Sequence, residues 1–315
     1  MKKYFQNNKT ITKSFTKLTK EQKRKIKVVR KLSRLIDYVI LILSLLALIV
    51  GIYTYVDTNI ILDNASSQKY QIYKPSKENN YTFDEIKNIN KDVIGWIDIY
   101  GTKIDYPIVQ GKDNDEYINK TVLGEFSTAG SIFLDYRNSY DFSDFQNIIY
   151  GHYMVERKMF GDISLFSDEN FFDTHKYGVL HRVDKKSKGI KILAYLKTLG
   201  SSKTYLQPAK KEEEKKWLIE TIQKEAINKR EEDLESEKNI LILDTCNLEE
   251  TNGRYILVCT LTYKIEENPF EEEKENKYKK LLDKAKGINF FEIILLFWII
   301  LLIVYILEKK KEKRS

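Results

Sequence analysis

Short runs of β-branched, aliphatic and aromatic residues, broken by polar turn residues, fill the middle of the chain and predict short β-strands. These runs recur from Val93 onward, and turn residues such as Asn252-Gly253 separate them. Eight strands are expected, at 94–99, 106–110, 131–135, 147–150, 177–183, 190–196, 239–246 and 254–264. Short strands at this spacing are typical of a closed or nearly closed barrel. We therefore expect a mostly β fold, an eight-stranded β-barrel with peripheral helices, over residues 81–265.

Two segments of this domain show helical periodicity instead. Residues 82–90 have the pattern of a short capped helix. The connection 208–237, between the sixth and seventh strands, begins with Pro208, which suits the first position of a helix. One apolar stripe follows at helical spacing, formed by Trp217, Leu218, Ile219, Ile222 and Ala226. The sequence therefore predicts a longer helix before the seventh strand.

Two long apolar runs flank the domain, at 36–56 and 288–307. A helix of about 19 uncharged residues is roughly 28 Å long, which is enough to cross the hydrocarbon core of a bilayer. The second run is apolar around the whole helix circumference, which exceeds what burial of one face requires. A buried C-terminal helix of a soluble domain is the alternative for that run. We expect N- and C-terminal transmembrane helices.

Basic residues gather outside these two apolar runs. Residues 1–34 carry thirteen Lys or Arg and one acid, and residues 308–315 carry five Lys or Arg and two Glu. Because basic segments stay on the cytoplasmic side, the tails 1–35 and 308–315 are expected in the cytoplasm. The first tail is expected to be loosely ordered or to lie against anionic lipid. The segments 57–80 and 266–287 then serve as linkers to a domain on the opposite side.

The composition excludes several classes of site. The formal net charge is +7, but residues 35–307 hold 35 basic and 43 acidic residues, so no nucleic-acid-binding body is indicated. Three histidines and two cysteines without a CxxC pair do not form a zinc site or a disulfide framework. Residues 113–117 resemble the start of a calcium loop, but Ile118 and Gly124 occupy the positions that require Gly and Glu. We expect no metal and no organic cofactor.

Candidate chemistry lies at strand ends. In the strand 239–246, Ile240, Ile242 and Asp244 face one side and Leu241, Leu243 and Thr245 the other, which leaves Cys246 where a loop begins. Arg254 opens the next strand, so strand pairing would bring its guanidinium close to the thiol and stabilise the thiolate. His152 follows Gly151, which permits an unusual backbone angle, and supplies a candidate base.

Each of these residues also has an ordinary interpretation. Cys246 would then be a buried small side chain, Arg254 an exposed charge and His152 a surface histidine. Cys259 lies in the middle of a strand, and His175 and His181 lack a strand-to-loop setting, so these three are expected to be structural.

In combination, the residues resemble the sortases, membrane-anchored cysteine transpeptidases of Gram-positive bacteria, and most of all the class B branch. The segment Ile242-Leu-Asp-Thr-Cys246 is similar to the family motif Thr-Leu-x-Thr-Cys, with Ile in place of the first Thr. Arg254, eight residues on, and Tyr150-Gly-His152 are similar to the segments that supply the arginine and histidine of the family. The class B resemblance also includes 92–99, 106–114, 129–137 and 159–163.

This resemblance implies a catalytic triad of Cys246, His152 and Arg254. The thiolate of Cys246 attacks a threonine carbonyl in the C-terminal sorting signal of a secreted protein and forms a thioester. His152 transfers protons, and Arg254 holds the substrate backbone or the oxyanion. An amine of a peptidoglycan precursor then receives the protein. The expected location is the cell membrane of a Gram-positive bacterium, with the catalytic domain extracellular.

Three alternatives remain at this point. A pilin-polymerising sortase would use a pilin lysine as its acceptor, and the C-terminal apolar run is common in pilus-building members. A cysteine hydrolase on a similar barrel would use water. A non-catalytic membrane-tethered scaffold would use the thiol only for packing. The sequence does not specify the sorting motif, the acceptor amine or the client proteins.

Overall fold

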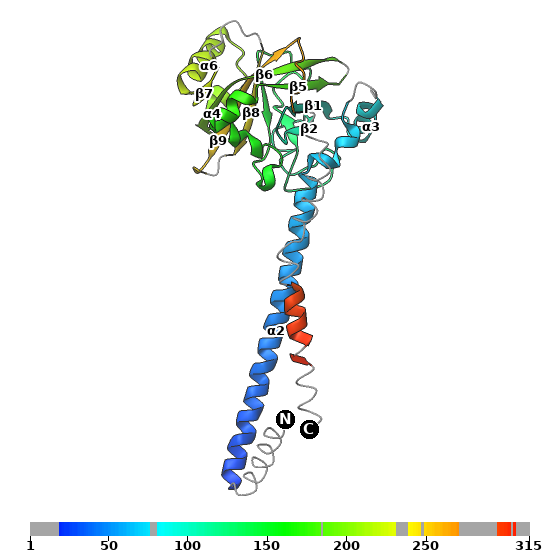
Figure 1. The fold of residues 1–315 in the computed structure, drawn as a ribbon, viewed down its shortest axis with the longest axis vertical. Coiled ribbons are helices and arrows are strands. Elements are labelled where there is room, and N and C mark those ends of the chain that lie inside the picture. Colours follow the sequence, from blue (N-terminus) through cyan, green and yellow to red (C-terminus); the bar gives the residue numbers. More distant parts are fainter. Residues whose placement is uncertain are drawn as a thin grey trace.

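The core of the computed structural model is a β-barrel, carried at one end of a long helix (Figure 1). The structure describes residues 19–75, 81–183, 185–230, 239–246, 249–270, 295–303, 305 and 306. The strands are β1 (Val93–Ile99), β2 (Asp105–Val109), β3 (Ile132–Leu134), β4 (Gln146–Tyr150), β5 (Tyr177–Arg182), β6 (Lys185–Leu199), β7 (Asn228–Lys229), β8 (Ile240–Cys246) and β9 (Gly253–Thr262).

Eight of these strands close into a barrel, which confirms the expected fold. The neighbours follow the order β5-β1-β2-β3-β4-β8-β9-β6, and an additional pairing of β5 with β6 closes the ring. All eight predicted strands are present at nearly the predicted positions. The short strand β7 was not predicted and lies beside β6. The β2–β3 and β4–β8 pairs are parallel, and the other pairs are antiparallel.

Strand β8 is buried on both faces, because apolar clusters lie on either side of the sheet there. Leu241 and Leu243 belong to the larger core cluster. Ile240 and Ile242 belong to a second cluster, between the sheet and the segment that contains α5 (Lys203–Leu206) and α6 (Glu212–Glu225). A strand with two buried faces requires a nearly continuous apolar run, which is what the sequence supplies before Asp244.

The helix predicted to start at Pro208 begins later, at Glu212. The carboxylate of Glu214 accepts hydrogen bonds from the backbone N–H groups of Lys210 and Lys211, and these bonds stabilise the helix start. Leu218, Ile219 and Ile222 are buried as the apolar stripe predicted. Trp217, however, is 60% exposed and is not part of the buried face. Helix α6 ends at Glu225, so Ala226 caps it rather than extending it.

Shorter helices cover the rest of the barrel. The predicted helix at 82–90 is present as α3 (Tyr81–Ile89). The remaining short elements are α4 (Glu169–Thr174) and the 3₁₀ turns η1 (Ser67–Lys69), η2 (Gln71–Tyr73), η3 (Val155–Arg157) and η4 (Gly161–Ser167). Turns η1 and η2 lie in the predicted linker 57–80, which is therefore partly ordered.

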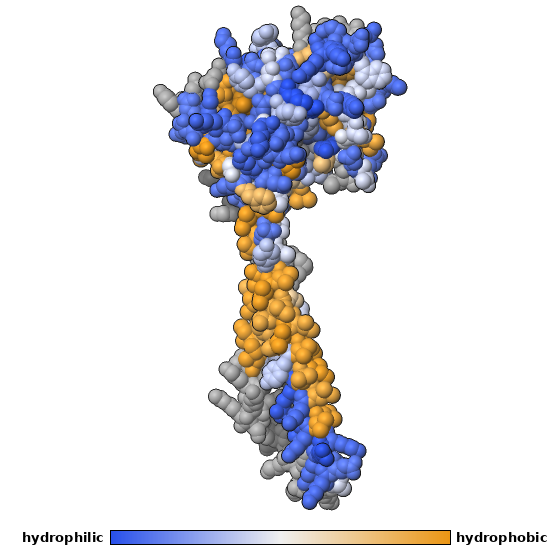
Figure 2. All heavy atoms as spheres, turned by 180° about the vertical axis from the view of Figure 1, so that it is seen from behind, coloured by the Kyte–Doolittle hydropathy of each residue, from blue (hydrophilic) through white to orange (hydrophobic). Residues whose placement is uncertain are grey.

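Helix α2 (Lys20–Asn64) is much longer than the predicted span 36–56. Residues 20–35 are helical rather than loosely ordered, because Thr19 and Gln22 form a capping box that starts the helix there. The helix also continues through 57–64, the first part of the predicted linker. Its middle is a hydrophobic band between a hydrophilic head and a hydrophilic far end (Figure 2). Within the described part of the chain, α2 is the helix long and apolar enough to cross a membrane.

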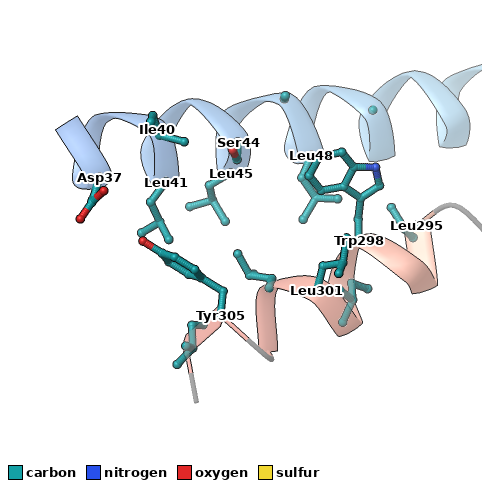
Figure 3. A pocket seen from close by; sticks show the side chains of 15 residues that line it. Asp37, Ile40, Leu41, Ser44, Leu45, Leu48, Leu295, Trp298, Leu301 and Tyr305 are labelled. Atoms are coloured by element: carbon teal, nitrogen blue, oxygen red, sulfur yellow. The ribbon is translucent and has the colours of Figure 1, made fainter. Parts of the chain in front are cut away.

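The second predicted span, 288–307, is described only in part. Residues 295–303, 305 and 306 are helical and lie beside α2, and the rest of the span falls outside the described residues. An open apolar cavity of about 830 Å³ lies between the two helices (Figure 3). Asp37 and Tyr305 lie at one end of this cavity. The predicted tail 308–315 and most of the linker 266–287 also lie outside the described residues.

Candidate active site

Cys246 is the last residue of β8, and its side chain is exposed. In the antiparallel β8–β9 ladder it lies directly opposite Arg254. Residues directly opposite in such a ladder project from the same face, with their Cβ atoms about 5 Å apart. The structure therefore places Arg254 opposite Cys246, with both side chains on one face of the ladder.

His152 reaches the same edge of the sheet from the other neighbour of β8. Strand β4 is parallel to β8, with Tyr150 opposite Asp244, and the backbone N–H of Gly151 extends the ladder by donating to the carbonyl of Asp244 at 3.1 Å. His152 and Cys246 each follow this last pair by two residues. Parallel pairing therefore brings the imidazole and the thiol to one edge, although the two residues are far apart in the sequence.

Gly151 serves this site for a different reason from the one predicted. Its φ is not among the positive values found in the chain, so an unusual backbone angle is not what requires glycine. A Cβ at this position would lie 2.5 Å from Cδ1 of Ile132 and 2.7 Å from the ring of Phe160. Glycine is required because these two side chains pack against the backbone.

The imidazole of His152 has one fixed hydrogen bond. Its Nε2 lies 2.9 Å from the backbone carbonyl oxygen of Ile118. Because a carbonyl oxygen only accepts, Nε2 carries the proton in this contact. Nδ1 is then the ring nitrogen that remains to exchange a proton with a reacting group.

The loop after His152 has a strained backbone. Glu156, Arg157 and Met159 have positive φ values of 61°, 61° and 52°. Such conformations cost on the order of 1–3 kcal/mol each for residues other than glycine, and they persist where surrounding contacts hold them. Here Phe160 donates its backbone N–H to the carbonyl of His152 at 3.0 Å. The loop is thereby closed back onto the residue that carries the imidazole.

Arg254 forms an ion pair with the buried carboxyl group of Asp244. Nη1 of Arg254 donates to Oδ2 of Asp244 at 3.2 Å, and the Asp244 side chain is fully buried while the Arg254 side chain is 28% exposed. Burial raises the pKa of Asp244 to about 7, and the nearby charge of Arg254 only partly opposes this.

A close turn lies on the other side of the guanidinium. A Cβ on Gly200 would lie 3.2 Å from Nε of Arg254 and 2.4 Å from Oδ1 of Asn252. Gly200 also donates its backbone N–H to the carbonyl of Asn252 at 2.7 Å. The guanidinium therefore occupies a narrow space between this turn and Asp244.

Sequence reasoning assigned no role to Asp244. The signal that could have found it is an acidic residue in an otherwise apolar strand, two positions before the cysteine and on the same face. A charged group in a strand buried on both faces needs a partner, and Arg254 is the cation opposite that end of the strand.

The other cysteine and histidines lie away from this edge, in agreement with the structural roles expected for them. Cys259 is fully buried in β9, and burial raises the pKa of its thiol. The ring of His175 stacks between Phe171 and Phe270, with centroid distances of 3.6 and 4.7 Å. His181 pairs through Nδ1 with the hydroxyl of Ser187 at 2.9 Å. Among the described residues, no group of three or more His, Cys, Asp or Glu could hold a metal ion.

The three predicted residues bring together the groups that acyl transfer requires. An exposed thiol can act as a nucleophile, an imidazole can carry a proton, and a guanidinium can stabilise negative charge on a carbonyl oxygen.

Comparison with known proteins identifies relatives of the chain. No protein-family model matches it. Sortase B of Listeria monocytogenes is 42% identical over 118 residues, or 36% of this chain, and the match spans about half of that protein, 48% of its length. Sortase B of Staphylococcus aureus is 27% identical over 240 residues, which cover 73% of this chain and 98% of that protein. The crystal structure of a Streptococcus pyogenes class B sortase involved in pilus biogenesis matches with a TM-score of 0.52 and 37% identity. That match covers 57% of this chain and 97% of the other.

Proposed function

The chain belongs to the class B sortases, and from this membership we propose that it is a membrane-anchored cysteine transpeptidase. It would cleave the C-terminal sorting signal of secreted proteins and transfer them to an amine of the cell wall. The observation that carries the proposal is the convergence at one sheet edge of Cys246, Arg254 opposite it in the ladder, and His152 from the parallel neighbour.

In the first half of the reaction, the thiolate of Cys246 attacks the carbonyl carbon of a threonine in the sorting signal. The oxyanion that forms accepts hydrogen bonds from Arg254, whose guanidinium stays charged and offers several donors. The C–N bond then breaks, and the protonated imidazole of His152 gives its proton to the leaving amine. The products are a thioester on Cys246, a neutral imidazole and the released C-terminal peptide.

In the second half, an amine attacks the thioester carbonyl. His152 accepts the proton that the amine loses, and the thiolate of Cys246 departs. A new amide bond joins the secreted protein to the acceptor, and the enzyme returns to its starting state. The same steps with water would make the enzyme a hydrolase, so dependence on the amine separates the two activities.

We propose a peptidoglycan precursor as the acceptor, with pilin polymerisation as the second candidate. The second candidate is favoured by the relative from Streptococcus pyogenes, which is described as involved in pilus biogenesis. A pilin polymerase would require the side-chain amine of a pilin lysine in place of a cell-wall amine.

The proposed location is the cell membrane of a Gram-positive bacterium, with the barrel outside the cell. It is supported by the exposed apolar middle of α2 and by the basic residues at the Lys20 end of that helix. The apolar C-terminal segment would be a second membrane helix, and both termini would be cytoplasmic. Membrane lipid would then surround α2, and no nucleic-acid partner is proposed.

The test is cleavage and transpeptidation by the full chain in detergent micelles. A panel of fluorogenic sorting peptides would be offered alone, with triglycine and with a lysine-containing pilin peptide. The wild type, Cys246→Ala and the matched control Cys259→Ala would be compared. Product that depends on an amine, is lost in Cys246→Ala and persists in Cys259→Ala is expected. Cleavage that ignores amines would indicate a hydrolase, and no turnover of any peptide would favour a non-catalytic scaffold.

A further inference from the structure

Asp244 is a buried carboxyl group directly behind the candidate nucleophile. It lies two residues before Cys246 on β8, so both side chains project from the same face of the strand. Its Oδ2 accepts the hydrogen bond from Nη1 of Arg254 at 3.2 Å. Within the described part of the chain, Oδ1 of Asp244 has no hydrogen-bond partner, and neither has Nε of Arg254. The carboxyl group is buried, and the pair it forms with Arg254 is incompletely hydrogen-bonded.

A second Asp–Arg pair on the same barrel, Asp135 with Arg137, is more fully hydrogen-bonded. Asp135 is equally buried, yet it binds Arg137 through two parallel hydrogen bonds, Nε to Oδ1 at 2.8 Å and Nη2 to Oδ2 at 2.6 Å. Burial raises the pKa of Asp135, but these bonds outweigh it and leave the pKa below its ordinary value. Asp244, with one longer bond, has its pKa raised to about 7. Asp135 is therefore ionised at neutral pH, whereas Asp244 changes protonation there.

We propose that Asp244 is a positioning residue for transpeptidation: its ionised carboxylate fixes the Arg254 guanidinium beside the Cys246 thiol, and its protonation releases the guanidinium. This inference rests on the proposed function, in which Arg254 binds the substrate carbonyl or the oxyanion. A guanidinium held on one side by a carboxylate, and confined on the other by Gly200, directs its remaining N–H groups to a fixed place. Such pre-organised donors stabilise a transition state more than mobile donors do.

Other ionisable groups lie around Asp244. They are Cys246 on β8, Arg254 on β9, Tyr150 on β4 and His152 in the loop after β4. The Asp135–Arg137 pair lies beyond Tyr150, and the hydroxyl of Tyr150 donates to Oδ2 of Asp135 at 3.0 Å. The pH profile of the wild type alone would not separate Asp244 from its neighbours. The ratio of wild type to an Asp244 variant isolates the contribution of this carboxyl group.

The experiment measures kcat and KM of the full chain in detergent from about pH 6 to about pH 8.5. This range spans the ionisation expected for Asp244, whose pKa is raised by burial. The variants are Asp244→Asn, Arg254→Ala and the double variant. Asp98→Asn is the matched control. Asp98 lies on the distant strand β1, and its nearly buried carboxylate is paired with Lys74. Unfolding by denaturant is measured for the same proteins at both ends of the pH range.

As pH rises across this range, the ratio of wild-type kcat/KM to that of Asp244→Asn is expected to increase about 10-fold, mainly through kcat. A roughly 10-fold effect corresponds to one charge-assisted hydrogen bond in a transition state. In the Arg254→Ala background, Asp244→Asn is expected to change nothing further. The ratio for Asp98→Asn is expected to stay constant with pH. The double-variant cycle on unfolding is expected to show coupling between Asp244 and Arg254 that is larger at high pH.

Two results would overturn the inference. A ratio that is constant with pH, or that falls as pH rises, would show that Asp244 does not position Arg254 for catalysis. Absence of coupling in the unfolding cycle would show that the carboxylate does not hold the guanidinium. If the wild type turns over no peptide, the proposed function fails and the catalytic role fails with it. The unfolding cycle needs no substrate, so it still shows whether the pair exists and separates the two failures.

Discussion

The ammonium group of Lys158 donates a hydrogen bond to the backbone carbonyl of Leu62 at 2.7 Å, and it joins the loop after His152 to the last turn of α2. A second link runs through Tyr106. Its hydroxyl accepts the backbone N–H of Met159 at 2.9 Å and donates to the carbonyl of Ala65 at 2.8 Å. The helix proposed to lie in the membrane is thus bonded to the strained loop that follows the imidazole.

Lys158→Met is expected to lower kcat/KM by about 3- to 10-fold, because the loop loses a charged hydrogen bond that helps to hold its strained conformation. The stability of the whole barrel should fall by only about 1 kcal/mol, since the change removes one hydrogen bond of a partly buried lysine and leaves a side chain of similar length in its place. Turnover of the full chain and its thermal unfolding would be measured together. Lys216→Met on the outer face of α6 is the matched control, and equal turnover in the two variants would contradict the prediction.

Gly200→Ala is expected to displace Arg254, because the new Cβ would lie 2.4 Å from Oδ1 of Asn252 and 3.2 Å from Nε of the arginine. The expected result is a fall in kcat/KM of about 10-fold, with a loss of stability of about 1–3 kcal/mol from overpacking. Gly124→Ala is the control. Alanine is disfavoured at Gly124 by the backbone, whose φ is 87°, rather than by crowding. A Cβ there would meet only the end of the Lys120 side chain, at 4.0 Å. A stability loss without a change in turnover would show that Arg254 is not displaced.

The two cysteines are expected to differ in their reaction with iodoacetamide. Cys246 is exposed, whereas Cys259 is fully buried and the pKa of its thiol is raised by burial. The folded protein should therefore incorporate one equivalent of the reagent, and the unfolded protein two. Mass spectrometry of the intact chain gives the count. Peptide mapping that finds the label on Cys259 in the folded state would contradict this assignment.

His181 is expected to destabilise the protein in acid. Burial, with a smaller contribution from Lys74, lowers its folded-state pKa to about 4, against about 6.5 in the unfolded chain. The unfolded state therefore binds the proton more readily, and stability falls as pH drops from about 6.5 towards about 4. The loss is on the order of 2–3 kcal/mol from this group.

His181→Gln should remove that part of the pH dependence. The comparison of unfolding free energies between wild type and variant cancels the carboxylates that titrate over the same range. A constant difference between the two proteins from pH 4 to pH 7, the span of these ionisations, would refute the assignment.

The strands were predictable because their signal is local. Alternation of side chains along a strand has a period of two residues, so a short window of sequence reveals it. All eight barrel strands were found from such short windows, as runs of β-branched and apolar residues bounded by turn residues. The two-residue strand β7 was missed, because two residues carry no period. The start of α6 was missed because the carboxylate of Glu214, rather than Pro208, caps it.

The extent of α2 shows where local reasoning ends. Apolar composition located the central span, but the polar turns at both of its ends are also helical. A capping box with Gln22 continues the helix at one end. Contacts of Leu62 and Ala65 with the barrel hold it at the other. Those last contacts join residues distant in sequence, which composition does not reveal.

By itself, the sequence determined that Cys246 ends a strand, that Arg254 begins the next, and that His152 follows a strand and a glycine. Their pattern also carried the resemblance to the sortases. Only the tertiary structure decided that β4 lies parallel to β8, that Gly151 is required for space, and that Asp244 is buried against Arg254. The physical reason is range. Strand period and turn residues act between neighbours in the chain, whereas strand order, register and burial arise when distant segments share one core.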